Sequence, residues 1–262
     1  SLGYWGDRLK AAGYAFKKGE RFGEKMLTFT NPGNIDYELV GIADDMPDEV
    51  GALVVTAGTA MYALTELGGL VAGESVAVIG LGPIGLLVAA VAKALGASPV
   101  IAADIAANRL EIARKLGADH IVNVRNIDAV EVAHKLNGGK GVDYAVECSA
   151  APDAVNTAVH MVNRGGKVCL AAFLHEKVAV DIAHVVKNNI YLYGIRGEGK
   201  SATHRAEALM RQKRFDAGLI HTHTFALEDL PTAISYAKNH TDNAIKVVVK
   251  ARGVARIDVA AE

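Results

Sequence analysis

A short apolar strand followed at once by a glycine-rich turn and a helix is the feature that most limits how this sequence can fold. Val76 to Ile79 is apolar without alternation, as a strand buried on both faces should be. The next six residues read Gly-Leu-Gly-Pro-Ile-Gly, and residues 84–95 carry apolar side chains at helical spacing. This order predicts the first unit of a parallel sheet covered by helices.

The glycines of this turn have separate steric roles in a dinucleotide-binding loop. Gly80 permits the tight turn, Gly82 leaves room for a pyrophosphate, and Gly85 lets the helix approach the strand. Pro83 and Ile84 complete the loop at the helix start, where free amide groups attract phosphates. Glycine-rich turns are common, so the preceding strand and the following helix are what make a dinucleotide site the preferred interpretation.

An acidic residue lies where such a loop needs one. Asp104 ends the next predicted strand, roughly twenty residues on, where a carboxylate binds the ribose 2′-hydroxyl. The same charge repels a 2′-phosphate, so the predicted cofactor is NAD rather than NADP. Arg109 lies nearby and is counted with the cofactor-binding residues. Its alternative interpretation is an ordinary solvated arginine on a helix.

Strands and helices alternate along the middle of the chain, which predicts an α/β fold of the Rossmann type, a doubly wound parallel sheet. The predicted strands are residues 76–79, 99–103, 120–123, 143–147, 167–173 and 190–194, and the predicted helices are 84–95, 107–116, 127–136 and 152–163. We divide the chain into a small irregular α+β N-terminal segment (1–44), an NAD-binding domain (45–197) and a C-terminal return segment (198–262).

Composition argues against several classes of function. Lys and Arg number 28 and Asp and Glu 29, so no dominant cationic field favours nucleic acid. The longest apolar run, residues 76–92, is interrupted by three glycines and a proline, so we expect no membrane span. The two cysteines exclude a disulfide scaffold and favour a reducing, cytoplasmic location. Cys148 and Cys169 are expected to be inert core thiols.

Residues 45–250 resemble the medium-chain dehydrogenases, the group of zinc-type alcohol, polyol and threonine dehydrogenases. The stretches that carry the resemblance are AGESVAVIGLGPIGLLVAAVAKALGA, AADIAANRLEIARKLGADHIVN, GVDYAVECSA, VNRGGKVCLAAF and FALEDLPTAISYAKNHTDNAIKVVV. The resemblance implies an NAD-dependent oxidoreductase that transfers hydride between the cofactor and a secondary alcohol or ketone. It also implies cofactor-binding residues beyond the loop, which are Ser149 on the adenosine side and Thr59, Ala172, Ile195 and Arg196 near the nicotinamide.

The resemblance further implies a homodimer joined at sheet edges, with Val178 to Val180 and Ile190 to Tyr193 as the edge region. It does not supply a zinc site. The position of the family's third zinc ligand falls on Val55 or Thr56, and neither is a credible ligand. The first two ligands and the cysteine-rich structural loop belong to barrel sequence that we do not find. We therefore expect no zinc and assign no catalytic residue.

Two histidines are candidates for a separate metal site. His221 and His223 are two residues apart, so in a strand they face the same side and could form half a site. Partly exposed strand histidines are the preferred interpretation of this pair.

Residues 1–41 are similar to the C-terminal part of a vicinal-oxygen-chelate module, as in glyoxalases and ring-cleaving dioxygenases. The similarity rests on a helix ending at Gly13, on Arg21 to Lys25 leading into a strand, and on a turn at residues 31–34 before a strand with Glu38. Glu38 matches a metal ligand of that family, but one carboxylate is not a metal site. The alternatives to a dehydrogenase are therefore a non-catalytic NAD(H)-binding remnant and a fragment of a metal-dependent enzyme.

Overall fold

The computed structural model describes residues 2–21, 24–30, 36–40, 46–66, 69–197, 199 and 201–250. Its main layer is a six-stranded sheet in which every neighbouring pair is parallel. In spatial order the strands are β6 (His120–Asn123), β5 (Val100–Asp104), β4 (Val76–Ile79), β7 (Val142–Glu147), β8 (Val162–Leu170) and β9 (Tyr191–Gly194). The strand order reverses between β4 and β7, which confirms the predicted doubly wound α/β fold.

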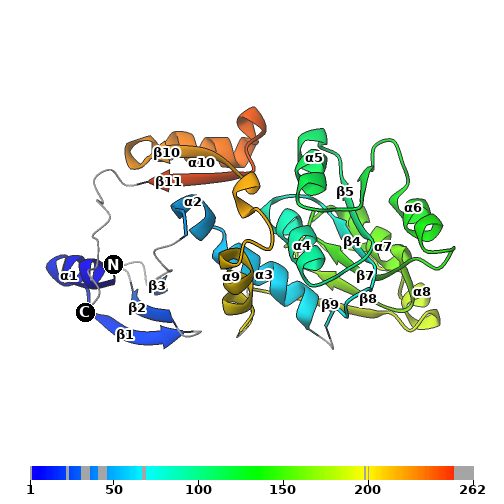
Figure 1. Ribbon diagram of the computed structural model, residues 1–262, viewed down its shortest axis with the longest axis horizontal. Coiled ribbons are helices and arrows are strands. Elements are labelled where there is room, and N and C mark those ends of the chain that lie inside the picture. The colour runs from blue at the N-terminus through cyan, green and yellow to red at the C-terminus, as the bar shows by residue number, and fades with distance from the viewer. Residues whose placement is uncertain are drawn as a thin grey trace.

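Helices cover both faces of this sheet (Figure 1). The helices are α3 (Val54–Thr65), α4 (Pro83–Ala94), α5 (Ala107–Lys115), α6 (Ala129–Leu136), α7 (Pro152–Met161) and α8 (Ile182–Lys187). Val76 and Val78 of β4 point into a core shared with α3, α4 and α5. Ala77 and Ile79 point into a second core shared with α6 and α7. Successive strand residues face opposite sides, so a strand between two cores must be apolar throughout.

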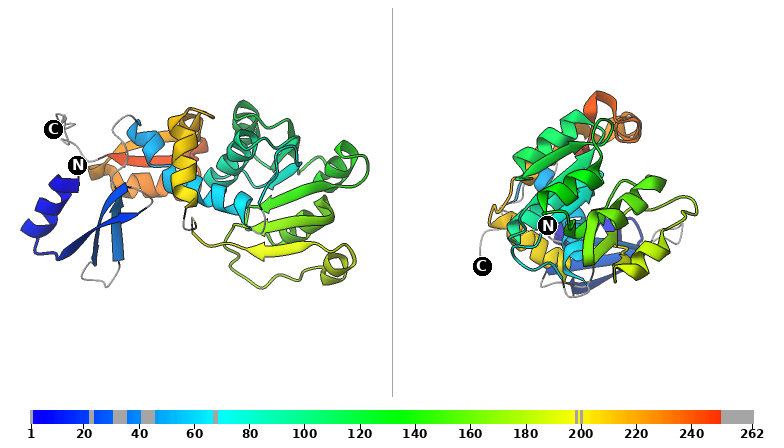
Figure 2. Two further views of the ribbon diagram at one scale, coloured as in Figure 1. Left: turned by 60° about the horizontal axis from the view of Figure 1, so that its bottom comes forward. Right: turned by 90° about the vertical axis from the view of Figure 1, so that its right-hand side faces the viewer.

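The rest of the described chain forms two smaller sheets and their helices. Residues near the N-terminus form α1 (Leu2–Ala11) and an antiparallel sheet of β1 (Phe16–Arg21), β2 (Glu24–Thr30) and β3 (Asp36–Val40). Residues beyond β9 form α9 (Ala202–Arg211), α10 (Leu230–Asn239) and a parallel pair, β10 (His221–Ala226) with β11 (Lys246–Lys250). The short helix α2 (Asp48–Gly51) precedes α3. Figure 2 shows β1 to β3 at the opposite end of the molecule from the six-stranded sheet.

Helix α3 is tied to the large sheet by two tyrosines. The hydroxyl groups of Tyr144 on β7 and Tyr193 on β9 contact each other, and both donate to the carbonyl oxygen of Ala63. Burial raises the pKa of Tyr144 above its ordinary value, so the hydroxyl keeps its proton as a donor. The helix α3 also packs against α9. Residues of the predicted return segment are thus in contact with the nucleotide-binding part, while the domain boundaries at 44 and 197 stay a prediction.

One strand differs from its prediction. The predicted strand 167–173 is β8, which begins at Val162 and ends at Leu170. The sequence pattern puts Gly165 and Gly166 at the end of the preceding helix, but they lie inside this strand. The register against β7 jumps from Val162 to Lys167, so the intervening residues bulge out of the ladder. Glycine therefore marks a bulge here rather than a helix terminus.

Other differences are smaller or concern residues that sequence reasoning left open. The strand β1 was not predicted, and the predicted turn at residues 31–34 lies outside the described residues. Glu38 lies in β3, as expected of a strand residue. At the edge of the large sheet, β9 is confirmed as the last strand, but Val178 to Val180 do not form a strand. None of the described helices combines the length and the apolar character that a membrane crossing requires.

Asp143 fastens three strands together at the amino edge of the sheet. Its carboxylate accepts hydrogen bonds from the backbone amide of Ser75 (2.8 Å), the Ser75 hydroxyl (2.7 Å) and the Asn163 side-chain amide (2.6 Å). Burial alone would raise the pKa of Asp143, but these donors outweigh it and lower the pKa below its usual value.

We expect Asp143→Ala to lower the free energy of unfolding by about 2–3 kcal/mol at pH 7, because donors from three groups lose their acceptor. A carboxyl whose pKa is depressed by folding stabilises the protein above its unfolded pKa of about 3.9 and loses that effect as the pH falls through the folded pKa. The difference between the two proteins should therefore shrink below about pH 4. Urea unfolding at several pH values measures it, with the exposed Glu176→Gln as the matched control.

Candidate dinucleotide-binding site

The loop between β4 and α4 is too tight for any side chain at two of its glycines. Gly80 has a φ of +86°, and a Cβ there would lie 2.6 Å from the backbone nitrogen of Ser149. A Cβ at Gly85 would lie 1.8 Å from the carbonyl oxygen of Gly80. Because neither glycine has a Cβ, the first turn of α4 can lie directly against the end of β4 and the loop after β7.

The remaining glycine of the loop faces open space. Gly82 precedes α4 with a φ of −66°, and a Cβ there would meet no protein atom within 4 Å. Pro83 and Ile84 follow as the first residues of α4, and no side chain caps this helix. The first amide groups of a helix have no partner within it, so this end of α4 offers donors and a positive dipole to an anion. The open side of Gly82 leaves room for a diphosphate.

Asp104 is held beside this loop by the backbone. One carboxylate oxygen accepts from the amide of Leu81 (2.6 Å) and the other from the amide of Ala106 (2.8 Å). The side chain is buried at the end of β5, one strand away from the glycine loop. A carboxylate oxygen has two acceptor positions, so each oxygen can still accept from one hydroxyl of a ribose. The predicted acid therefore lies beside the glycine loop, and its role in binding a ribose stays a prediction.

Arg109 is not the free helix arginine of the alternative interpretation. Its guanidinium lies 3.9 Å from the Asp104 carboxylate and 3.2 Å from Nδ1 of His240. His240 ends α10 in a left-handed conformation, 131 residues further along the chain. Arg109 therefore links the acid of the nucleotide site to the segment that follows β9.

Ser149 is positioned by a buried acid that sequence reasoning missed. One oxygen of the Glu147 carboxylate accepts from the Ser149 amide (2.6 Å), the Ser149 hydroxyl (2.6 Å) and the Ala150 amide (3.0 Å). Glu147 is fully buried at the end of β7, and its second oxygen has no hydrogen-bond partner among the described residues. An acidic residue directly after the run Tyr-Ala-Val (144–146) was the signal in the sequence.

The residues predicted near the nicotinamide come from three parts of the chain. The amide of Ile195, after β9, donates to the carbonyl oxygen of Leu170 at the end of β8 (3.1 Å). Arg196 is exposed and its guanidinium lies 5.8 Å from the ring centroid of Phe173, next to Ala172. These residues share the carboxyl edge of the sheet with the glycine loop. Thr59 lies on α3, and its hydroxyl donates back to Val55 within the same helix.

Cys169 is buried in β8, as expected of a core thiol, whereas Cys148 follows β7 and is only partly buried. Burial raises the pKa of Cys169 to about 12 and also raises the pKa of Cys148, so both stay protonated. A register shift separates His221 from His223 on β10, and Nε2 of His221 lies 3.1 Å from the His223 carbonyl oxygen and 2.8 Å from the Thr224 hydroxyl. Among the described residues, neither histidine belongs to a group of potential metal ligands.

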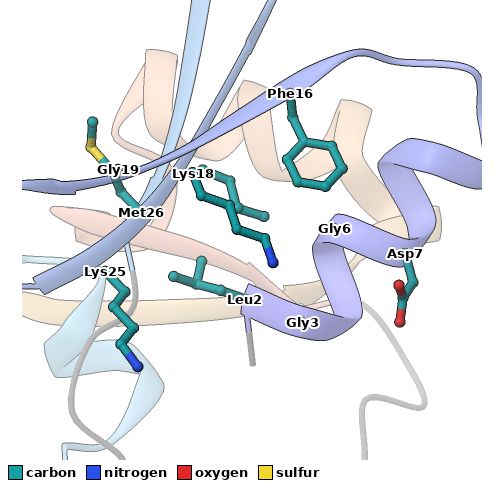
Figure 3. A pocket seen from close by; sticks show the side chains of 10 residues that line it. Leu2, Gly3, Gly6, Asp7, Phe16, Lys18, Gly19, Lys25 and Met26 are labelled. Atoms are coloured by element: carbon teal, nitrogen blue, oxygen red, sulfur yellow. The ribbon is translucent and has the colours of Figure 1, made fainter.

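A cavity of about 310 Å³ lies away from the glycine loop, between α1 and the β1–β2 hairpin (Figure 3). The ring of Phe16 lies against Gly6, and Lys18 extends toward Leu2. Asp7 and Lys25 are the other charged residues of its lining. None of the residues predicted to bind the cofactor lines this cavity.

A parallel sheet, a glycine loop at its point of strand reversal and an acid one strand away define a Rossmann-type dinucleotide-binding unit. Residues 83–212 match the zinc-binding dehydrogenase family. The L-threonine 3-dehydrogenase of Pseudoalteromonas translucida is 35% identical over 188 residues, which cover 72% of this chain and 54% of that protein. The enzyme of the same name from Escherichia coli K12 is 34% identical over the same share of each chain.

Solved structures agree with these sequence relatives. The 2R,3R-butanediol dehydrogenase of Bacillus subtilis superposes with a TM-score of 0.73 at 27% identity, over 83% of this chain and 61% of that chain. The alcohol dehydrogenase of Thermus sp. ATN1 gives 0.74 at 26%, over 84% and 62%. The nucleotide-binding part of this chain belongs to the medium-chain dehydrogenase family, as its sequence predicted.

The chain spans about half the length of the curated relatives it matches. These relatives support the dehydrogenase resemblance. They do not support the vicinal-oxygen-chelate resemblance of residues 1–41, which stays a prediction.

We expect Gly85→Ala to lower the free energy of unfolding by roughly 1–3 kcal/mol, because the new methyl group overlaps the Gly80 carbonyl and forces α4 away from β4. Gly82→Ala is the matched control: its methyl group meets no protein atom, so the cost should stay below about 1 kcal/mol. Urea unfolding of both variants gives the comparison. Equal destabilisation would contradict this account of the loop.

Proposed function

We propose that this chain is an NAD-dependent oxidoreductase that transfers hydride between the cofactor and a secondary alcohol or ketone. The observation that carries the proposal is the open side of Gly82 next to the backbone-held carboxylate of Asp104. This pairing suits a diphosphate at the start of α4 and a ribose diol at the end of β5. The carboxylate disfavours a 2′-phosphate, which supports NAD over NADP.

The residues of this chain bind and orient the cofactor in this proposal. The loop from Gly80 to Gly85 holds the diphosphate, Asp104 accepts from the ribose, and Ser149 lies on the adenosine side. Ala172, Ile195 and Arg196 border the nicotinamide, which accepts or donates the hydride when bound. Thr59 is proposed to approach the nicotinamide from α3. We assign no residue to polarise the substrate oxygen.

A catalytic zinc at the family's usual position is not proposed for this chain. The position of the family's third zinc ligand falls on Val55 or Thr56 in α3, where the side chains are an isopropyl group and a hydroxyl. Neither side chain has the thiolate, imidazole or carboxylate that binds zinc in proteins. The same observation favours a second candidate function, a protein that binds NAD(H) without turnover.

The substrate class comes from the relatives. L-threonine and 2R,3R-butanediol, which appear in the names of two of them, are both secondary alcohols. We propose a small secondary alcohol or its ketone for this chain as well, with no nucleic-acid or membrane partner. The two free thiols favour a cytoplasmic location.

A titration of the protein with NADH and NADPH, followed by fluorescence, tests the binding step. We expect NADH to bind at least roughly tenfold more tightly than NADPH, because the Asp104 carboxylate repels the 2′-phosphate. Gly82→Ala should weaken NADH binding about tenfold or more, since its methyl group occupies the space for the diphosphate. Binding that Gly82→Ala leaves unchanged would place the cofactor elsewhere.

Turnover then separates the two candidate functions. Oxidation of NADH with a panel of ketones, and reduction of NAD with L-threonine and 2,3-butanediol, is expected for the oxidoreductase. Tight NADH binding without turnover of any member of the panel favours the binding protein. A Glu176→Gln variant serves as the control, because this exposed residue is not among the proposed cofactor-binding residues.

We also propose a homodimer joined along β9. Phe173, Ile182, Val186 and Tyr191 expose large apolar side chains in the segment leading up to and into this edge strand. An open apolar edge favours pairing with a second copy.

Sedimentation at micromolar concentration should therefore show a dimer, and Val186→Lys should shift it toward the monomer. The exposed Ile234 on α10 supplies the control substitution Ile234→Lys, which should leave the mass unchanged. A monomeric parent protein would contradict the proposal.

A further inference from the structure

Two histidines and an aspartate lie close together where α7 meets α8, and none of them belongs to the proposed cofactor-binding residues. His160 lies in the last turn of α7, just before β8, and Asp181 and His184 lie at the start of α8. The ligand atoms of the three side chains all lie within 4.8 Å of one another. His160 Nε2 is 3.3 Å from an oxygen of Asp181, and the two imidazole centroids are 4.3 Å apart.

The backbone around this cluster is fixed by hydrogen bonds. Asn156 of α7 donates to the carbonyl oxygen of Ala179 and accepts from the amide of Asp181, both at 2.9 Å. One oxygen of Asp181 accepts from the His184 amide and caps α8 (2.9 Å). The other oxygen is the one that faces His160. The cap thus orients the carboxylate while leaving one oxygen to act as a ligand.

The histidines are also suited to metal binding. The Nε2 of His134 in α6 donates to the backbone carbonyl of His160 (2.9 Å), which fixes the end of α7. A lone surface ion pair between His160 and Asp181 would not explain why a second imidazole stands beside it.

We propose that His160, Asp181 and His184 bind one divalent transition-metal ion of the Zn²⁺ class. Two imidazoles and a carboxylate are ligands that Zn²⁺ accepts in proteins, and water can complete the tetrahedron. The ion would connect α7 to α8 and so fix the connection between β8 and the edge strand β9. This site does not depend on the proposed dehydrogenase function, because it shares no residue with the cofactor-binding set.

Metal binding is tested on the full chain, purified without a histidine tag and dialysed against a chelator. We expect isothermal titration with Zn²⁺ to give about one equivalent bound, and Co²⁺ to give the visible absorption of a four-coordinate ion. Excess Zn²⁺ at about a hundred times the dissociation constant should raise Tm by roughly 5 °C.

Ligand variants locate the ion. His184→Ala and the double variant His160→Ala/His184→Ala should weaken Zn²⁺ binding roughly 100-fold or more and abolish the rise in Tm. Asp181→Asn keeps an oxygen to cap α8 but removes the charge, so it should weaken binding at least tenfold. His120→Asn, at the opposite edge of the sheet, should change nothing.

Folding of each metal-free variant is checked by its Tm without added metal. No bound Zn²⁺ in the parent protein overturns the proposal. So does full-affinity binding that survives the double variant, because the ion would then sit at other residues.

Discussion

The approach of α4 to β4 at Gly85 is the contact on which the nucleotide-binding part depends. A Cβ at this position would lie 1.8 Å from the Gly80 carbonyl oxygen, so the helix can start here only because Gly85 has none. That start sets the position of Gly82 and of the free amides at the helix end. It also brings the loop next to Ser149, and Leu81 within reach of Asp104. The geometry of the proposed cofactor site therefore follows from one close backbone contact.

Buried and partly buried carboxylates fasten the ends of the parallel strands. Asp104 joins β5 to the loop after β4. Glu147 accepts from the backbone amide of Ser149 and so stabilises the turn that follows its own strand, β7. Asp143 does the same at the amino edge, where it joins the starts of β4 and β7 to the bulge of β8. Strand ends have amides without ladder partners, and a carboxylate satisfies several of them at once. At the carboxyl edge two of these carboxylates, Asp104 and Glu147, lie beside the proposed cofactor site.

The sequence predicted the structural features that depend on neighbouring residues. It missed those that depend on contacts between residues far apart in the chain. The apolar run of β4, the glycine spacing and Asp104 predicted the sheet and the loop, because each signal spans a few residues. The predicted start of β8 was wrong because the glycines of a bulge resemble those of a helix terminus. Arg109 was ambiguous because its partner His240 is 131 residues away. His160 and Asp181 likewise meet only through the path that Asn156 imposes on the chain.

The connection between β8 and β9 carries residues of two proposed sites, the cofactor site and the metal site. It leaves the sheet after Leu170, is held to α7 by Asn156, and enters β9 at Tyr191. Ala172 at its start and Ile195 after β9 are proposed to border the nicotinamide, and its middle holds Asp181 and His184. A flexible connection would have to be ordered when the cofactor binds, at a cost in conformational entropy. Contacts that fix its middle in advance reduce that cost, so an ion on α7 and α8 would favour cofactor binding without touching the cofactor.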